Sequence, residues 1–253
     1  MMKGLRSLYY REMRIWSRTY WMIVLSLSTP ILYILLFGLA MTGLIQGIDY
    51  QGKEIDYLLF LLPGMIAMGI HGCGMNACWT LFMDRQMGTL EQILSSPVTR
   101  SAYGFGKILS VVTQSFIQVF LILVVGLPLV GKEISIANLP LLLFSAFLGG
   151  VCFCSFYMIL ASIIKTNDLL STISTLIMMP MMFCSSMFYP LDMIPSTLRY
   201  LAYANPMTYI ANTLRAGLIG SLSKQVSIEL LVLCAFSIAL FSASVLSLRR
   251  IRI

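Results

Sequence analysis

The fold depends most on residues 188–209, FYPLDMIPSTLRYLAYANPMTY, where three prolines, an aspartate and an arginine interrupt an otherwise apolar chain. A long uncharged run precedes this stretch, and another follows shortly after it. Proline removes a backbone donor and restricts the residue before it, so the stretch does not read as one straight helix. We therefore expect a broken element between two membrane-like helices.

The composition indicates the class of protein. Of the 253 residues, 58% are hydrophobic and 11% are charged, and the mean hydropathy is +0.88. Roughly a quarter of the residues of a soluble domain are charged. Membrane β-strands would be about 10 residues of alternating polarity, which these long apolar runs do not show. The sequence therefore predicts an all-α integral membrane protein, with residues 1–253 forming one transmembrane domain.

Six uncharged runs are each about as long as the ~20 residues that a helix needs to cross ~30 Å of hydrocarbon. The first run is too long for a signal peptide and 18 residues precede it, so we interpret it as a retained span. The predicted transmembrane helices are 20–45, 57–83, 104–130, 138–164, 169–188 and 227–248.

Charge is distributed unevenly between the segments that join these spans. An even number of spans puts both termini on one side, which carries 12 of the 17 Lys and Arg residues and 4 acidic residues. The other side carries 5 basic and 6 acidic residues. Because Lys- and Arg-rich segments stay inside the cell, both termini are predicted to be cytoplasmic. The basic charge is thus not read as nucleic-acid binding.

Sequence motifs for catalysis, metals or nucleotides are missing. There is no HExxH or GxSxG motif, and no Gly-Lys pair is followed by the Ser or Thr of a phosphate loop. The six cysteines lie in apolar runs without metal spacing. We expect no catalytic residue, cofactor or metal in this chain.

Ionisable side chains at membrane depth would indicate an ion-driven carrier. Within the six uncharged runs, His71 is the one side chain that could carry a coupling proton. It has no ionisable neighbour in its span, so a hydrogen-bonded packing role is favoured over a proton relay. The methionine-rich span 169–188 fits either plain packing or an adaptable substrate path. Energy for uphill transport would then come from a separate cytoplasmic subunit.

An amphipathic helix is predicted over residues 1–19, with an apolar and aromatic stripe beside a basic one. Such a helix lies in the plane of the lipid headgroups. It serves as a membrane-surface anchor, and contact with a cytoplasmic partner is compatible with that role. The residues that carry the prediction are Arg11, Arg14, Trp16 and Arg18.

Residues 84–100, DRQMGTLEQILSSPVTR, form the one substantial loop on the inner side. A short helix is expected over 89–94, with its apolar face free and nothing of its own chain to pack on. The loop is the candidate docking site for a cytoplasmic subunit, with charges at its rim. Its predicted docking residues are Asp84, Arg85, Gly88, Thr89, Leu90, Glu91, Ile93, Leu94 and Pro97.

The stretch around 188–209 is predicted to form two short helices on the outer side. One is expected over 196–204 and the next over 207–216, because Asn205-Pro206 ends the first and Pro206 can open the second. We interpret 189–220 as a re-entrant hairpin; two surface helices in an outer loop are the alternative. Its marked residues are Tyr189, Pro190, Pro195, Arg199, Asn205, Pro206, Tyr209 and Arg215.

In these features taken together, the sequence resembles an ABC-2 type transporter permease of the NodJ/DrrB-like kind. The resemblance covers essentially the whole chain. It rests on the basic helix before the first span, on the Gly-Thr-Leu-Glu core and following proline of 84–100, and on 188–215. The last segment is the most specific, with its aromatic-Pro, its Asn-Pro and its terminal Leu-Arg.

The resemblance implies a permease subunit of an ATP-driven exporter in a bacterial or archaeal cytoplasmic membrane. Two such chains would form the pathway among membrane lipids, above two copies of an ABC ATPase that bind ATP and Mg²⁺. Residues 89–94 would be the coupling helix and 1–19 the interface helix. Relatives of this kind export drugs, lipids, glycolipids or polysaccharides.

Two other classes remain as alternatives. A non-transport sensor or immunity protein on the same fold would share these features. An intramembrane lipid-modifying enzyme is less favoured, because Asp84 with Glu91 lacks a second catalytic motif.

Overall fold

The computed structural model describes residues 2–42, 47–50, 52–96, 98–130, 138–220 and 223–249. In chain order the elements are α1 (Met2–Arg18), α2 (Tyr20–Tyr33), the π-helical turn η1 (Ile34–Gly38), α3 (Leu39–Thr42), β1 (Ile48–Tyr50), β2 (Lys53–Ile55), α4 (Tyr57–Gln86), α5 (Thr89–Ser95), α6 (Arg100–Val130), α7 (Leu139–Ile163), α8 (Asn167–Phe183), the 3-10 turn η3 (Leu191–Met193), α9 (Ser196–Ala204), α10 (Pro206–Ile219) and α11 (Lys224–Arg249).

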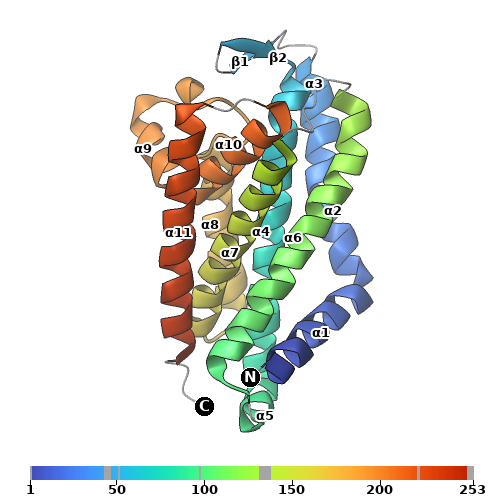
Figure 1. Cartoon of the computed structure of the whole chain (residues 1–253), viewed down its shortest axis with the longest axis vertical. Coiled ribbons are helices and arrows are strands. Elements are labelled where there is room, and N and C mark those ends of the chain that lie inside the picture. Colours follow the sequence, from blue (N-terminus) through green and yellow to red (C-terminus); the bar gives the residue numbers. More distant parts are fainter. Residues whose placement is uncertain are drawn as a thin grey trace.

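The long helices form a bundle with two distinct ends (Figure 1). One end carries α5, the start of α1 and the last turn of α11, and the other carries the β1–β2 hairpin. The beginning and the end of the described chain therefore lie at the same end of the bundle. α4 is buried along almost its whole length, whereas α11 faces mostly outward.

The all-α class is confirmed, but six spans are not. Four described helices are long and apolar enough to cross a membrane: α4, α6, α7 and α11. A fifth span results if α1 and the helix after it, which are bent by 65°, count as one broken crossing. α8 has 17 residues, about 26 Å of helix, and falls short of that test.

α8 ends at Phe183 rather than at 188 because polar side chains bind the backbone at its end. The Asn205 amide donates to Met181 O and Cys184 O, at 2.8 Å each. Ser186 lies in the turn that follows and donates to Thr208 O of α10 at 3.2 Å. The two Asn205 bonds satisfy carbonyls at the end of α8 that a continuing helix would otherwise use.

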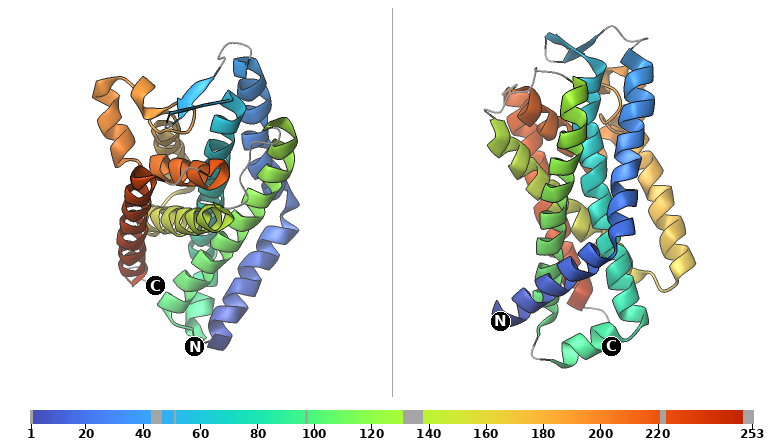
Figure 2. Two further views of the ribbon diagram at one scale, coloured as in Figure 1. Left: turned by 45° about the horizontal axis from the view of Figure 1, so that its top comes forward. Right: turned by 90° about the vertical axis from the view of Figure 1, so that its right-hand side faces the viewer.

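Close approach of backbones holds α4, α7 and α10 together. A Cβ at Gly74 of α4 would lie 2.9 Å from the carbonyl carbon of Phe153 in α7. A Cβ at Gly217 of α10 would lie 2.9 Å from the Cα of Leu142 in α7. Small residues at helix crossings permit such packing in membranes. Figure 2 shows α10 lying across the bundle beside α7 and α11.

His71 lies in the middle of this packing. Its Nε2 is hydrogen-bonded to the Tyr157 hydroxyl at 2.8 Å, and its ring meets the Phe153 ring edge-on at 4.9 Å. The His71 and Tyr157 side chains are both buried. The hydrogen-bonded packing role is the one that the structure shows.

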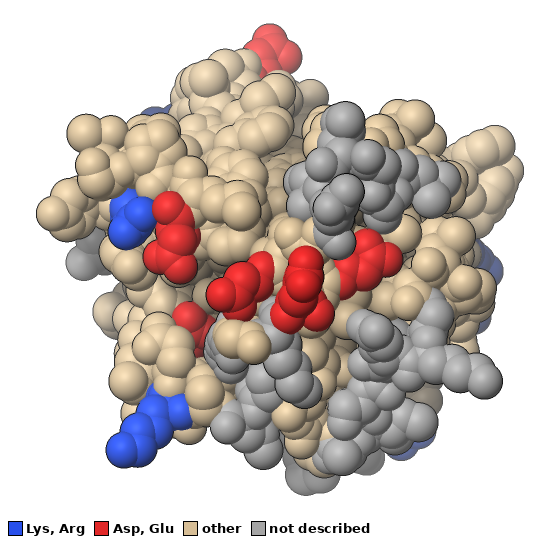
Figure 3. Space-filling view, turned by 90° about the horizontal axis from the view of Figure 1, so that it is seen from above, with Lys and Arg blue, Asp and Glu red and all other residues tan. Residues whose placement is uncertain are grey.

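The β1–β2 end carries the acidic charge. The short antiparallel hairpin pairs Ile48 with Ile55, a strand pair that the sequence analysis did not anticipate. The hairpin and the residue after it supply Asp49, Glu54 and Asp56. Seen from this end, acidic side chains gather near the middle of the face (Figure 3).

Candidate functional site

A buried cluster of four charged residues, the ion cluster, joins α1 to α4 and α6 near the α5 end. It consists of Arg11, Glu12, Asp84 and Lys107. Arg11 donates through both Nη atoms to the Asp84 carboxylate, with Nη1 to Oδ2 at 3.0 Å, and also to Glu12 Oε1 at 2.8 Å. Lys107 Nζ lies 2.9 Å from Glu12 Oε2 and 3.7 Å from Asp84 Oδ2.

Neutral donors and acceptors complete the ion cluster. Tyr103 OH donates to Asp84 Oδ2 at 2.6 Å, and Lys107 Nζ donates to Thr80 Oγ1 at 2.8 Å. Lys107 is only 1% exposed, and Glu12 and Asp84 are also buried. Two cations and two carboxylates balance, which a buried arrangement requires because an unpaired charge there is costly.

The sequence analysis expected Asp84 and Arg85 to present charges at a docking rim, and the structure shows both side chains bonded within the chain. Asp84 is turned inward, and Arg85 Nη1 donates to the backbone oxygens of Ala161 and Ile164, the latter at 3.2 Å. The end of α4 is thereby tied to the end of α7. Whether either residue touches a partner stays a prediction, but both side chains are engaged within the chain.

Glu12 and Lys107 were not singled out from the sequence as site residues. Their signals were present, since Glu12 is the one acid in a basic helix and Lys107 the one charge inside the third predicted span. A charge near the end of a span is ordinarily read as snorkelling toward water. Only their contact across α1 and α6 shows that they are partners.

α5 begins after a left-handed residue and packs its apolar face inward. Gly88 has φ 68°, a conformation that glycine adopts without strain. Leu90 is only 4% exposed and belongs to an apolar cluster that includes Tyr103 and Leu248. Ile93 and Leu94 are half-buried against it.

The prediction that this face has nothing of its own to pack on is therefore wrong. The sequence pattern defined the face, but not the bundle end beneath it. The exposed side of α5 and of the turn before it carries Met87, which is 73% exposed, Glu91, Gln92 and Ser95. Thr89 is half-buried, and Pro97 lies outside the described residues.

α1 has an inner and an outer face. Leu8 is buried, and Tyr9 OH donates to Thr113 Oγ1 of α6 at 3.2 Å. Trp16 is half-buried, whereas Arg14 and Arg18 are exposed.

At the other end, Asn205 organises the start of the α9–α10 hairpin. Its Oδ1 accepts from Met207 N at 3.0 Å and caps α10, while its Nδ2 donates to two carbonyls at the end of α8. Pro206 occupies the first position of α10, where a missing N–H costs nothing. The Asn-Pro pair therefore joins two helices as well as ending α9.

Arg215 is fully buried in α10. Its Nε donates to Phe60 O at 3.1 Å, Nη1 to Asn212 Oδ1 at 2.7 Å and Nη2 to Ser186 O at 2.9 Å. Asn212 Nδ2 in turn donates to the buried Glu229 at 2.9 Å. The terminal arginine of the predicted hairpin is thus a core residue.

The remaining hairpin residues make local contacts. Arg199 Nη2 donates to Asp192 O and Ile194 O, at 3.1 and 3.3 Å. Tyr209 OH donates to Tyr203 O at 2.6 Å, and Tyr189 OH donates to Phe183 O. Pro190 precedes η3 and Pro195 precedes α9.

The His, Cys, Asp and Glu side chains in the described part of the chain form no metal-binding arrangement. No group of three or more His, Cys, Asp or Glu side chains there could hold a metal. What the arrangement offers is mechanical. The short helix α5 packs on one end of the bundle through its apolar face, and the ion pairs beside it join α1, α4 and α6.

A bundle of long apolar helices of this kind is typical of an integral membrane protein. The chain belongs to the ABC-2 type transporter family, whose sequence profile matches residues 3–219.

Named relatives agree with the family. The chain is 28% identical to the putative transport permease ycf38 of Cyanophora paradoxa, over 76% of this chain and 66% of that protein. It is 25% identical to the inner membrane transport permease YadH of Escherichia coli, over 86% and 83%. It is 22% identical to nodulation protein J of Rhizobium meliloti, over 93% and 92%.

Proposed function

We propose that this chain is the membrane subunit of an ATP-driven exporter that works with a separate cytoplasmic ATPase. Family membership supports the permease role, and members of this family generally work with ATPase subunits. The single observation that carries the ATPase contact is the exposed side of α5. It protrudes at one end of the bundle (Figure 1) and offers Met87 beside Glu91.

The orientation proposed here places the α5 end in the cytoplasm and the β1–β2 end outside. The basic charge of the inner segments and the acidic face of the outer end support this orientation. An ATPase subunit would then meet α5 directly. The outer hairpin would dip into the outer leaflet, where α10 is covered by α4, α7 and α11.

The ion cluster would transmit movement of α5 to the bundle. α5 follows directly on α4, and the last turn of α4 holds Asp84 in the ion cluster with Arg11 of α1. A push on α5 therefore moves α4, α1 and α6 together rather than bending the loop alone. This contact makes the N-terminal helix part of the coupling apparatus.

A second copy of the chain would complete the pathway. α8 exposes Leu176 and Met179, α2 exposes Leu25 and η1 exposes Leu36, each by at least 60%. These helices would border the pathway between two copies and prefer an apolar or amphipathic cargo such as a lipid, glycolipid, polysaccharide carrier or drug. With α8 and α2 each included, the chain would cross the membrane six times.

Co-purification tests this function. Met87→Asp and Glu91→Lys should each lower recovery of the cognate ATPase by at least about tenfold, because both side chains are exposed, on the turn before α5 and on α5, and neither change alters the backbone. Glu54→Lys, an equal charge reversal at the opposite end, is the matched control and should bind normally. Leu90→Asp is unsuitable as a docking test, because it would place a charge in the core.

Transport assays decide the remaining points. The purified permease alone should hydrolyse no ATP, and the reconstituted complex should hydrolyse ATP faster with its cargo. Full ATPase binding by both α5 variants would overturn the docking assignment. ATP hydrolysis that no lipid, glycolipid or drug stimulates, in a complex that forms normally, would favour the sensor alternative.

A further inference from the structure

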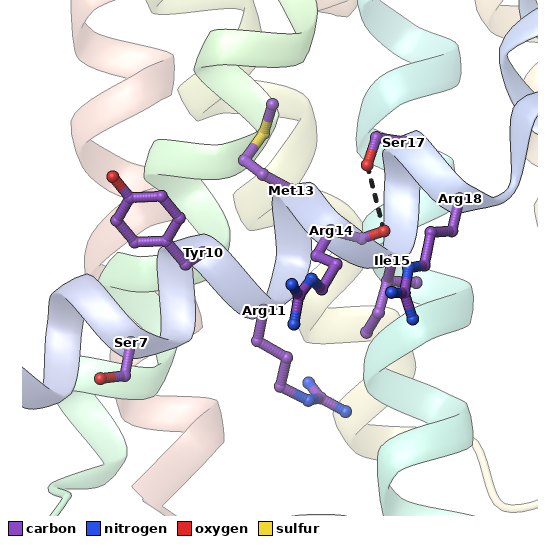
Figure 4. Close-up of a pocket in the computed structure, with 8 residues that line it drawn as sticks. All are labelled: Ser7, Tyr10, Arg11, Met13, Arg14, Ile15, Ser17 and Arg18. Carbon is purple, nitrogen blue, oxygen red and sulfur yellow. Dashed lines mark hydrogen bonds between the residues drawn. The ribbon is translucent and has the colours of Figure 1, made fainter.

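The outer face of α1 carries two arginines that the bundle does not use. Arg14 and Arg18 lie one helical turn apart, and both are exposed. Among the described residues no carboxylate pairs with either, whereas Arg11 on the same helix is held by Asp84. Figure 4 shows Arg11, Arg14 and Arg18 on one side of the helix, with the Ser17 hydroxyl bonded to Arg14 O at 3.2 Å.

Aromatic residues mark the depth at which these arginines lie. Tyr20 and Trp21 follow Arg18 at the start of α2 and are 58% and 64% exposed. Exposed Tyr and Trp at the end of a membrane helix sit at the headgroup level. Figure 2 shows α1 rising away from α5 toward α2, so its later half lies nearer to the membrane than the proposed docking surface does.

We propose that Arg14 and Arg18 bind the phosphate of an anionic phospholipid in the adjacent leaflet. Side chains four residues apart on a helix stand about 6 Å apart, so two guanidinium groups can share one phosphate. Guanidinium matches phosphate oxygens with paired N–H donors, and it carries the opposite charge. The proposal rests on the membrane orientation given above but not on ATPase docking.

Lipid binding would hold α1 in place from its outer side. The inner side of the same helix carries Glu12, whose carboxylate binds Lys107 in the ion cluster. The helix would thus be fixed between lipid headgroups and the bundle. Anionic lipid would support the position that the ion cluster requires.

Native mass spectrometry of the full-length permease tests this site. Detergent-solubilised protein is incubated with equal amounts of phosphatidylglycerol and phosphatidylcholine, and the ratio of bound lipids is measured. Arg14→Gln and Arg18→Gln should each lower phosphatidylglycerol enrichment about fivefold, as expected for one basic residue near an anionic surface. Arg6→Gln, the same change on the same helix, is the matched control and should retain enrichment.

Further arms separate the possible sources of the anion. Millimolar inorganic phosphate should not displace the lipid, and displacement would overturn the lipid assignment in favour of a soluble anion. Equal losses in all three variants would overturn it in favour of a diffuse basic field.

The same variants are also tested for ATPase co-purification in pure phosphatidylcholine. Normal recovery is expected. A loss of the ATPase there, with lipid enrichment unchanged, would overturn the proposal and assign this face to the protein partner.

Discussion

Asn205 shows how much one side chain contributes when it lies where three helices meet. Its amide accepts from the first turn of α10 and donates to the last turn of α8, while its own backbone ends α9. The residue is 7% exposed, so none of these groups would find water as a substitute partner. The Asn-Pro pair therefore ends α9 and also joins α8 to α10.

Asn205→Ala is predicted to destabilise the permease by about 2–4 kcal/mol, because it removes a cap and leaves buried carbonyls unpaired. This corresponds to a melting temperature roughly 5–10 °C lower, measured by thermal unfolding in detergent. The matched control is Asn138→Ala at the start of α7, whose side chain makes no cap bond. A similar loss in both variants would show that the capping bonds are not the cause.

At the scale of elements, the ion cluster decides how α1 sits. The helix would otherwise be a separate surface anchor, attached through its apolar stripe alone. Arg11 and Glu12 of this helix instead bind Asp84 of α4 and Lys107 of α6. Three elements far apart in the sequence thus share one set of charges.

A double-mutant cycle on the ion cluster measures this connection. Lys107→Met should cost about 3–5 kcal/mol in stability, because it leaves Arg11 alone to balance two buried carboxylates. Adding Glu12→Met should recover part of that loss, with a coupling energy of about 1–3 kcal/mol. Arg6→Gln on the exposed face of α1 should change stability by less than about 0.5 kcal/mol. Simple additivity of the two core substitutions would contradict a shared network.

At the scale of the whole molecule, the two bundle ends differ in shape and charge. The α5 end carries the beginning of α1 and the last turn of α11, and the β1–β2 end carries the acidic face. The bundle alone does not say which end faces the cytoplasm. The distribution of Lys and Arg predicts that the α5 end does, through the positive-inside rule.

Cysteine labelling tests that orientation. Glu54→Cys should react with a membrane-impermeant maleimide in intact cells, and Gln92→Cys should react only in inverted vesicles. The unsubstituted chain is the control, because its six cysteines are buried or half-buried within the bundle. The reverse pattern would invert the proposed topology, and labelling of both sites from one side would contradict the separation of the two ends.

Local chemistry explains why much of this protein could be predicted from its sequence. Apolar runs of membrane length predicted the class and most of the long helices, because every buried backbone group must be bonded within its own helix. Proline and asparagine predicted the break between α9 and α10. The family resemblance, carried by 84–100 and 188–215, agrees with the profile match.

Contacts between distant segments account for what could not be predicted. The pattern of α5 specified an apolar face but not whether a partner or its own bundle covers it, and Leu90 faces inward. Charge type alone did not separate Arg11, which is paired with Asp84, from Arg14 on the same helix, which pairs with no carboxylate among the described residues. Burial and pairing depend on neighbours that the chain brings together from far apart, so the tertiary structure alone distinguishes a docking charge from a core one.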